Sequence, residues 1–67
     1  MITIHLNGKA QQLDRPMTVA ELLQELDLKR EGIAVAVNQR VVPRTAHEEH
    51  TIADQAQVEI IRAVGGG

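Results

Sequence analysis

The sequence predicts an α+β fold in which a mixed sheet of four to five strands carries one main helix on one face. Strand-like segments flank a single stretch with helical periodicity, in the order strand, strand, helix, strand, short strand, loop, strand. Because one helix cannot cover both faces of a sheet, the economical arrangement is a single sheet with the helix on one side. The chain has 67 residues, which is the size of one small domain spanning 1–67.

The chain opens with a predicted β-hairpin. Residues 2–6 alternate strictly between apolar and polar side chains, and this alternation places Ile2, Ile4 and Leu6 on the core face. The next two residues are Asn-Gly, the strongest short-range signal for a hairpin turn. A second strand is therefore expected at 9–13.

The single helix is predicted to begin at Val19. Thr18 and Glu21 have the spacing of a capping box, in which each residue bonds the other's backbone N–H. The helix then carries one apolar stripe, formed by Val19, Leu22, Leu23 and Leu26. Polar residues between these positions face water, and the helical pattern ends before Gly32.

Two strands and an irregular segment are expected next. Residues 33–37 form a continuous apolar run, which is typical of a strand buried on both faces. A turn at 38–39 leads into a short strand at 40–42, which Pro43 ends. The polar stretch 44–57 predicts a loop with one helical turn.

The last strand is predicted to occupy the centre of the sheet and to run into the C-terminal glycines. Alternation along it places Val58 and Ile60 on one face and Ile61 and Ala63 on the other. If the first pair packs in the core, Ile61 and Ala63 belong to an exposed apolar patch, which is the usual mark of a docking surface.

A flexible tail is expected at 64–67, where Val64 is followed by Gly65, Gly66 and Gly67. Glycine lacks a Cβ atom, so such an arm fits a narrow channel and brings its backbone close to another molecule. Fully extended, the tail spans roughly 13 Å. These properties suit a terminal carboxylate on which a partner enzyme acts.

Composition excludes several classes of protein. The chain has no cysteine, which rules out a disulfide framework, a thiolate metal site and a cysteine nucleophile, and is consistent with a cytoplasmic protein. Its net charge of −2 and its lack of aromatic residues argue against nucleic-acid binding. No apolar run is long enough to cross a membrane. The core must be built from aliphatic side chains.

Four segments together resemble the ThiS family of ubiquitin-like sulfur carriers in thiamine biosynthesis, which have the β-grasp fold. They are Ile4-His5-Leu6-Asn7-Gly8, Thr18-Val19-Ala20-Glu21-Leu22-Leu23, Ala36-Val37-Asn38-Gln39-Arg40-Val41-Val42-Pro43-Arg44, and Val58-Glu59-Ile60-Ile61-Arg62-Ala63-Val64-Gly65-Gly66-Gly67. The Asn-x-x-Val-Val-Pro-Arg stretch is the most specific to the family. The family often has Asp-Gly-Asp before its last strand, where this chain has Asp54-Gln55-Ala56, so only the local turn geometry is in question.

The resemblance implies a function without catalysis by the chain itself. The carboxylate of Gly67 would be adenylated by a ThiF-type enzyme that uses ATP, and would then receive sulfur from a desulfurase system as a thiocarboxylate. Thiazole synthase would use that sulfur to form the thiazole ring of thiamine. No cofactor is expected on the chain, and docking to partners is expected around Ile61, Arg62, Ala63 and Val64.

Other readings of the sequence stay open at this point. A related sulfur carrier for molybdopterin synthesis, a ubiquitin-like modifier and a plain β-grasp binding module with an incidental glycine end share these features. His47 and His50 are three apart, but the segment lacks the zinc-protease pattern and a further ligand, so we expect a solvated charged loop and no metal site. His5 alternates with core residues and is expected on the solvent face. Arg62 and Arg44 are candidates for steering the chain toward an acidic or phosphate-bearing partner.

Overall fold

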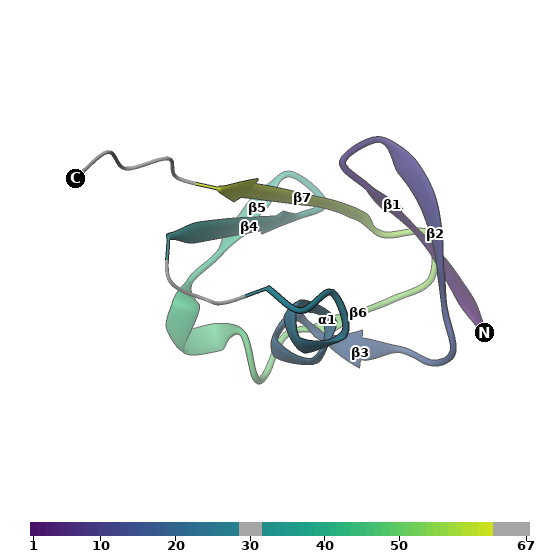
Figure 1. Cartoon of the computed structure of the whole chain (residues 1–67), viewed down its shortest axis with the longest axis horizontal. Helices are drawn as coiled ribbons and strands as arrows, with labels where there is room; N and C mark the ends of the chain where they lie inside the picture. The colour runs from purple at the N-terminus through teal and green to yellow at the C-terminus, as the bar shows by residue number, and fades with distance from the viewer. Residues whose placement is uncertain (29–31, 63–67) are drawn as a thin grey trace.

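The structure is a computed structural model that describes residues 1–28 and 32–62. Its elements follow one another as β1 (Ile2–Leu6), β2 (Lys9–Leu13), β3 (Met17–Thr18), α1 (Val19–Glu25), β4 (Ile33–Val37), β5 (Arg40–Val42), the 3₁₀ helix η1 (Arg44–Ala46), β6 (Thr51–Ile52) and β7 (Gln57–Arg62). Five of the strands form one sheet, and α1 packs against one of its faces (Figure 1). The predicted α+β architecture is confirmed.

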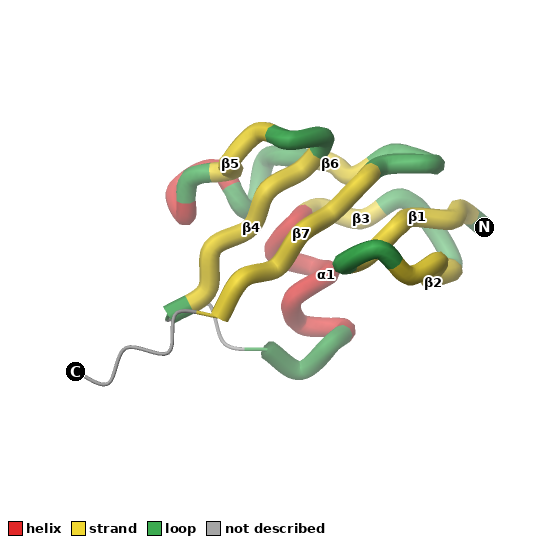
Figure 2. The backbone as a smooth tube through the Cα atoms, turned by 90° about the horizontal axis from the view of Figure 1, so that it is seen from above, coloured by secondary structure: helices red, strands yellow, loops and turns green. Residues whose placement is uncertain are grey.

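The last strand occupies the centre of the sheet, as the sequence predicted. The strand order is β2-β1-β7-β4-β5, with β7 parallel to β1 and antiparallel to β4. In Figure 2 the five strands lie side by side and α1 lies behind them. The β7 strand therefore has neighbours on both sides, which fixes its path more firmly than that of an edge strand.

Both predicted turns are tight hairpins that need left-handed backbone conformations. Asn7 and Gly8 have φ angles of 50° and 83°, and Asn38 and Gln39 have φ angles of 52° and 71°. Two successive positive φ angles define a type I′ turn, whose twist matches that of the strands it joins. Asparagine and glycine adopt these angles most readily, so the turn residues set the register of both hairpins.

The start of α1 has partners for its first free N–H groups. The Thr18 hydroxyl accepts from the Glu21 N–H at 3.1 Å, and the Glu21 carboxylate accepts from the Thr18 N–H at 2.9 Å. The carbonyls of His50 and His47 accept from the N–H groups of Val19 and Ala20. The capping box is thus confirmed, and the segment after β5 completes the cap from a distance in sequence.

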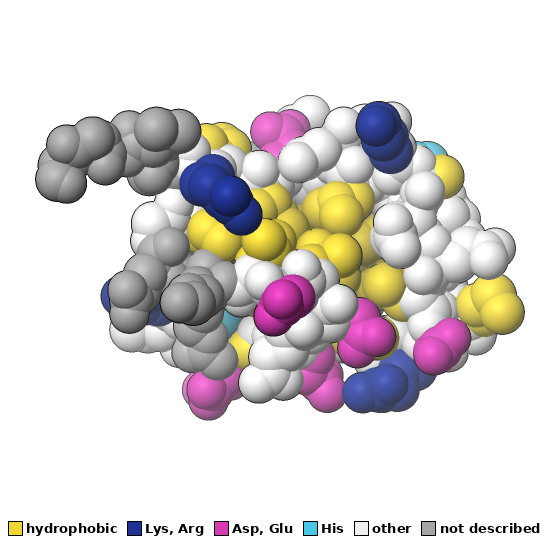
Figure 3. All heavy atoms as spheres, in the orientation of Figure 1, with side chains coloured by type: hydrophobic (Ala, Val, Ile, Leu, Met, Phe, Trp, Pro, Cys, Tyr) yellow, Lys and Arg dark blue, Asp and Glu magenta, His cyan; other side chains and the backbone are white. Residues whose placement is uncertain are grey.

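The core is aliphatic and lies between the sheet and α1. It consists of Ile4, Leu13, Met17, Val19, Leu22, Leu23, Val35, Val37, Val42, Ile52, Ala56 and Val58. Leu26 packs against this cluster and is partly buried, so the predicted helical stripe is confirmed. In Figure 3 the hydrophobic side chains fill the band between the two layers, and most acidic side chains on this view lie on the helix side.

The prediction that residues 33–37 are buried on both faces was wrong. Val35 and Val37 are buried, whereas Ala34 is exposed and Ala36 is partly exposed. The apolar run misled because alanine is small enough to lie on an open face at little cost. Helix α1 covers one face of the sheet, so the other face of β4 is open to solvent.

The segment 44–57 is more ordered than the sequence indicated. The expected helical turn is present as η1, but residues 51–52 form β6, which pairs with β3 in a second, two-stranded sheet. Such short strands carry too few residues for a periodic pattern. The turn before β7 forms with Gln55 at a φ angle of 68°, a conformation that normally favours glycine.

Candidate functional site

The β7 strand leads to the C-terminal end of the chain, and its two neighbouring strands hold it in place to different extents. On one side it pairs with β4 along all but its first residue, from Val58 opposite Val37 to Arg62 opposite Ile33. On the other side, pairing with β1 covers only Gln57 and Val58. Beyond that point β1 turns away into its hairpin.

The side chain of Asn7 continues the pairing where β1 ends. The Asn7 backbone N–H donates to the Val58 carbonyl at 2.9 Å. The Asn7 Oδ1 atom accepts from the Ile60 N–H at 2.9 Å, and Asn7 Nδ2 donates to the Ile60 carbonyl at 3.4 Å. The amide side chain thus takes the place of the next peptide group of β1.

Asn38 makes a similar pair of contacts at the opposite end of β7. Its backbone N–H donates to the Gln57 carbonyl at 2.7 Å, and its Oδ1 atom accepts from the Gln57 N–H at 3.0 Å. Both asparagines have positive φ angles and sit in hairpin turns. One therefore clamps the start of β7 from the β4 side, and the other clamps its later part from the β1 side.

An apolar patch lies on the sheet face that points away from α1. Ile61 lies opposite Ala34, and Ala36 lies opposite Val41. Val41 and Ile61 are 73% and 57% exposed, the largest values after Met1 among the big apolar side chains of residues 1–28 and 32–62. We call Ala34, Ala36, Val41 and Ile61 the outer patch. Its residue Ile61 directly precedes Arg62, the last described residue.

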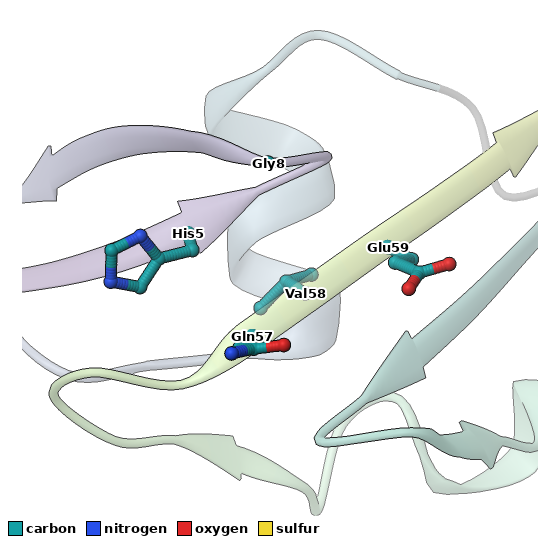
Figure 4. A pocket seen from close by; sticks show the side chains of 5 residues that line it. All are labelled: His5, Gly8, Gln57, Val58 and Glu59. Atoms are coloured by element: carbon teal, nitrogen blue, oxygen red, sulfur yellow. The ribbon is translucent and has the colours of Figure 1, made fainter.

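A shallow depression of about 350 Å³ lies on the same face, beside the outer patch. His5, Gly8, Gln57, Val58 and Glu59 line it (Figure 4). His5 comes from β1 and is half-buried, and Gln57 and Glu59 come from β7. The outer face is therefore polar over the paired part of β1 and β7 and apolar where β7 approaches its end.

The predicted docking residues separate into three groups. Ile61 is exposed in the outer patch, as the alternation predicted. Arg62 is also exposed, but it follows Ile61 and so belongs to the opposite face of the strand. Ala63, Val64 and the tail Gly65, Gly66 and Gly67 lie outside the described residues.

The expectation of a solvated loop at residues 47–50 was wrong for His47, which is only 2% exposed. Its ring Nε2 lies 3.2 Å from the Val42 carbonyl, so this nitrogen carries the proton and donates. The Nδ1 atom is buried without a partner. In residues 1–28 and 32–62, no group of three or more His, Asp or Glu side chains is arranged to hold a metal ion.

No helix in the described part of the chain is long and apolar enough to span a membrane. Within residues 1–28 and 32–62, Arg15 and Glu21 form an ion pair at 3.5 Å beside the start of α1.

Comparison with known proteins identifies the family. The model of the ThiS family matches residues 4–67. The chain belongs to the ThiS family. This match spans nearly the whole chain and includes the clamped strand and the glycine end, so the family assignment covers the scaffold as well as the candidate site.

Individual members of the ThiS family support the same conclusion. The chain is 38% identical over 64 residues to the sulfur carrier protein ThiS of Escherichia coli, covering 96% of this chain and 97% of that protein. The crystal structure of the thiamine biosynthesis protein ThiS from Geobacter metallireducens superposes with a TM-score of 0.87 at 32% identity, covering 98% of this chain and all of that one. The β-grasp fold that the sequence resemblance implied is confirmed.

A second kind of relative carries this domain within a longer protein. The chain is 32% identical over 62 residues to a thiazole synthase of Paramagnetospirillum magneticum, covering 92% of this chain but 19% of that protein. A segment resembling this chain therefore exists in the same polypeptide as a much larger remainder.

Reasoning from the sequence missed three features of the site. Asn7 and Asn38 were assigned to turns, but not to clamps on β7, because their partners lie 53 and 19 residues away. The exposure of Val41 was also missed. The sequence signal for it is alternation: Val41 precedes the buried Val42 in the short strand, so its side chain lies on the opposite face.

Proposed function

We propose that this chain is a sulfur carrier of thiamine biosynthesis and that it carries sulfur as a thiocarboxylate on Gly67. The observation that carries the proposal is the ThiS family match, which extends from the first strand through Gly67. The fold supports it, because the central strand β7 leads directly toward the glycine residues.

The proposed chemistry explains how a chain without cysteine carries sulfur. A carboxylate is ionised at neutral pH and is a poor electrophile. Its oxygen attacks the α-phosphorus of ATP, pyrophosphate leaves, and the acyl-adenylate now has AMP as a leaving group. A sulfur nucleophile at the oxidation level of sulfide attacks the carbonyl carbon, the bond to the AMP oxygen breaks, and a thiocarboxylate remains.

In this function the chain is a substrate and not an enzyme. The activating step belongs to a ThiF-type adenylating enzyme that binds the ATP, and the sulfur comes from a desulfurase system. The chain contributes an arm of glycines without side chains, which fits a narrow site. It also contributes a rigid strand from which that arm starts.

Thiazole synthase is the proposed acceptor of the sulfur. The support is the relative in which a segment similar to this chain belongs to a thiazole synthase polypeptide, and a second such protein from Magnetococcus marinus is 33% identical over 64 residues. A domain joined to its partner in one chain meets it at high effective concentration. A separate carrier must achieve the same meeting through a docking surface.

We propose the outer patch as that docking surface. It exposes Val41 and Ile61, and Ile61 lies at the end of β7 just before the chain end, so a partner that takes up the chain end covers this face at the same time. Arg62 is exposed on the opposite face of β7, and we propose that it meets a phosphate or an acidic side chain where the partner surrounds the end of the strand. Apolar contact then provides affinity, and the glycine arm provides access.

The test is intact-protein mass spectrometry after incubation with the adenylating enzyme, ATP and a sulfide source. We expect a gain equal to the replacement of one oxygen by sulfur, located to Gly67 by fragmentation. The gain should disappear without ATP, and it should be reversed when thiazole synthase and its substrates consume the sulfur. An unaltered chain that never gains this mass contradicts the carrier function and supports a plain β-grasp binding module.

A further inference from the structure

The two hydrogen-bonding edges of the later part of β7 are held in different ways. On the β4 side, regular strand pairing reaches Arg62. On the β1 side, the strand pairing ends at Val58, and the side chain of Asn7 supplies the next two hydrogen bonds at Ile60. Without that side chain, the Ile60 N–H and carbonyl on this side would have to bond water.

We infer that Asn7 is a positioning residue for the reaction at the C-terminus, an inference that rests on the proposed sulfur-carrier function. The Asn7 side chain holds Ile60, which lies two residues before the end of the described strand. It thereby helps to fix the path of β7 up to Arg62, the residue from which the C-terminal segment starts.

The geometry of Asn7 makes this role specific. Its φ angle of 50° is a left-handed conformation that asparagine and glycine adopt readily. The neighbouring Gly8, at φ 83°, completes the turn. Asparagine and glycine both suit the backbone conformation at position 7, whereas the bonds to Ile60 require the amide side chain.

Positioning of this kind acts on the rate of the chemical step. A reacting carboxylate has to reach a near-attack geometry, and a small displacement of its anchor reduces the fraction of molecules that do so. Binding to the partner depends on the outer patch, which Asn7 does not join. Loss of the Asn7 side chain should therefore lower kcat and leave KM for the carrier nearly unchanged.

Asn38 provides a matched control. It also has a positive φ angle, lies in a hairpin turn and bonds the backbone of β7 through its side chain. Its contact is with Gln57, at the start of the strand. Removing the Asn38 side chain breaks a comparable hydrogen bond to β7 but leaves the bonds between Asn7 and Ile60 intact.

The experiment compares Asn7→Gly, Asn38→Gly and the unaltered chain in thiocarboxylate formation, with the carrier concentration varied and the adenylating enzyme and ATP fixed. We expect Asn7→Gly to lower kcat by about tenfold or more with KM changed less than twofold. Asn38→Gly should stay within twofold of the unaltered chain. Asn7→Asp, which keeps the acceptor for the Ile60 N–H, should recover part of the rate.

Amide hydrogen exchange measured by NMR provides the second readout, because it reports on the clamp without any enzyme. The Ile60 amide should exchange faster in Asn7→Gly and stay protected in Asn38→Gly. The inference is overturned if kcat of Asn7→Gly equals that of the unaltered chain, or if both glycine variants lose rate equally.

Failure of the proposed function has a different result. If the unaltered chain is not modified at all, the carrier function is wrong and the positioning role is wrong with it. Exchange at Ile60 still decides whether Asn7 holds the strand. Circular dichroism shows that each variant is folded, and if Asn7→Gly does not fold, Asn7→Asp is compared with Asn38→Asp by the same two readouts.

Discussion

Ile61 of β7 lies directly opposite Ala34 of β4, on the sheet face that α1 does not cover. The pair leaves the Ile61 side chain 57% exposed, and Val41 two strands away is 73% exposed. Large apolar side chains on an open sheet face, next to the strand that leads to the chain end, are the physical basis for the proposed docking surface.

Replacing Ile61 or Val41 with serine should weaken binding to the adenylating enzyme by about tenfold, since each removes roughly 1–2 kcal/mol of apolar contact. Folding stability should change by less than about 0.5 kcal/mol, because both side chains are already exposed. The dissociation constant can be measured by calorimetry. Gln12→Ser, on an exposed edge strand of the same sheet, serves as control, and equal affinity of all three variants would show that the partner binds elsewhere.

Gly66→Val should abolish thiocarboxylate formation while leaving the unfolding transition unchanged. A valine side chain cannot pass where a glycine backbone fits, and it also restricts the backbone angles. The rate of mass gain measures the first effect and chemical denaturation the second. Extension of the chain past Gly67 should block the reaction as well. Modification of Gly66→Val at the normal rate would mean that the partner's site is wide or that the arm is not inserted.

His47→Ala should destabilise the fold by about 2–4 kcal/mol, because it removes a buried ring and leaves the Val42 carbonyl without that donor. His50→Ala is the matched control, since His50 is only half-buried and its backbone carbonyl can still accept from Val19. Urea midpoints at equal m-values measure the difference. Equal midpoints for the two variants would show that the His47 ring adds little to the core.

The contribution of Glu21 to folding stability should decrease as the pH falls below neutral. The hydrogen bond from the Thr18 backbone N–H lowers the pKa of Glu21, aided by the Thr18 hydroxyl and by the charge of Arg15. Because the pKa is lower in the folded state, the stabilisation is present above the ordinary glutamate pKa and is lost as the pH falls through the folded value. The group is exposed, so we expect a small effect.

The measurement for Glu21 is the unfolding free energy of the unaltered chain and of Glu21→Gln between pH 7 and pH 2. The difference between them should be largest at pH 7 and should shrink in acid. Glu25→Gln, further along the same helix, controls for the loss of one charge. A difference that is constant across this range would contradict a pH-dependent contribution from the capping box.

Local patterns in the sequence determined much of this protein. Asn7-Gly8 specified the first hairpin, and Thr18 with Glu21 specified the start of α1, because these signals act between residues a few positions apart. Alternation along the last strand specified that Val58 is buried and Ile61 exposed. The order of the elements was sufficient to predict the mixed sheet.

Only the tertiary structure decided which residues far apart in the chain meet. The bonds of Asn7 to Ile60 span 53 residues, and no local pattern encodes a contact at that separation. The burial of His47 depends on the packing of its segment against β5 and the start of α1, whose N–H groups need its carbonyl. Ala34 is exposed because the single helix covers only one face of the sheet.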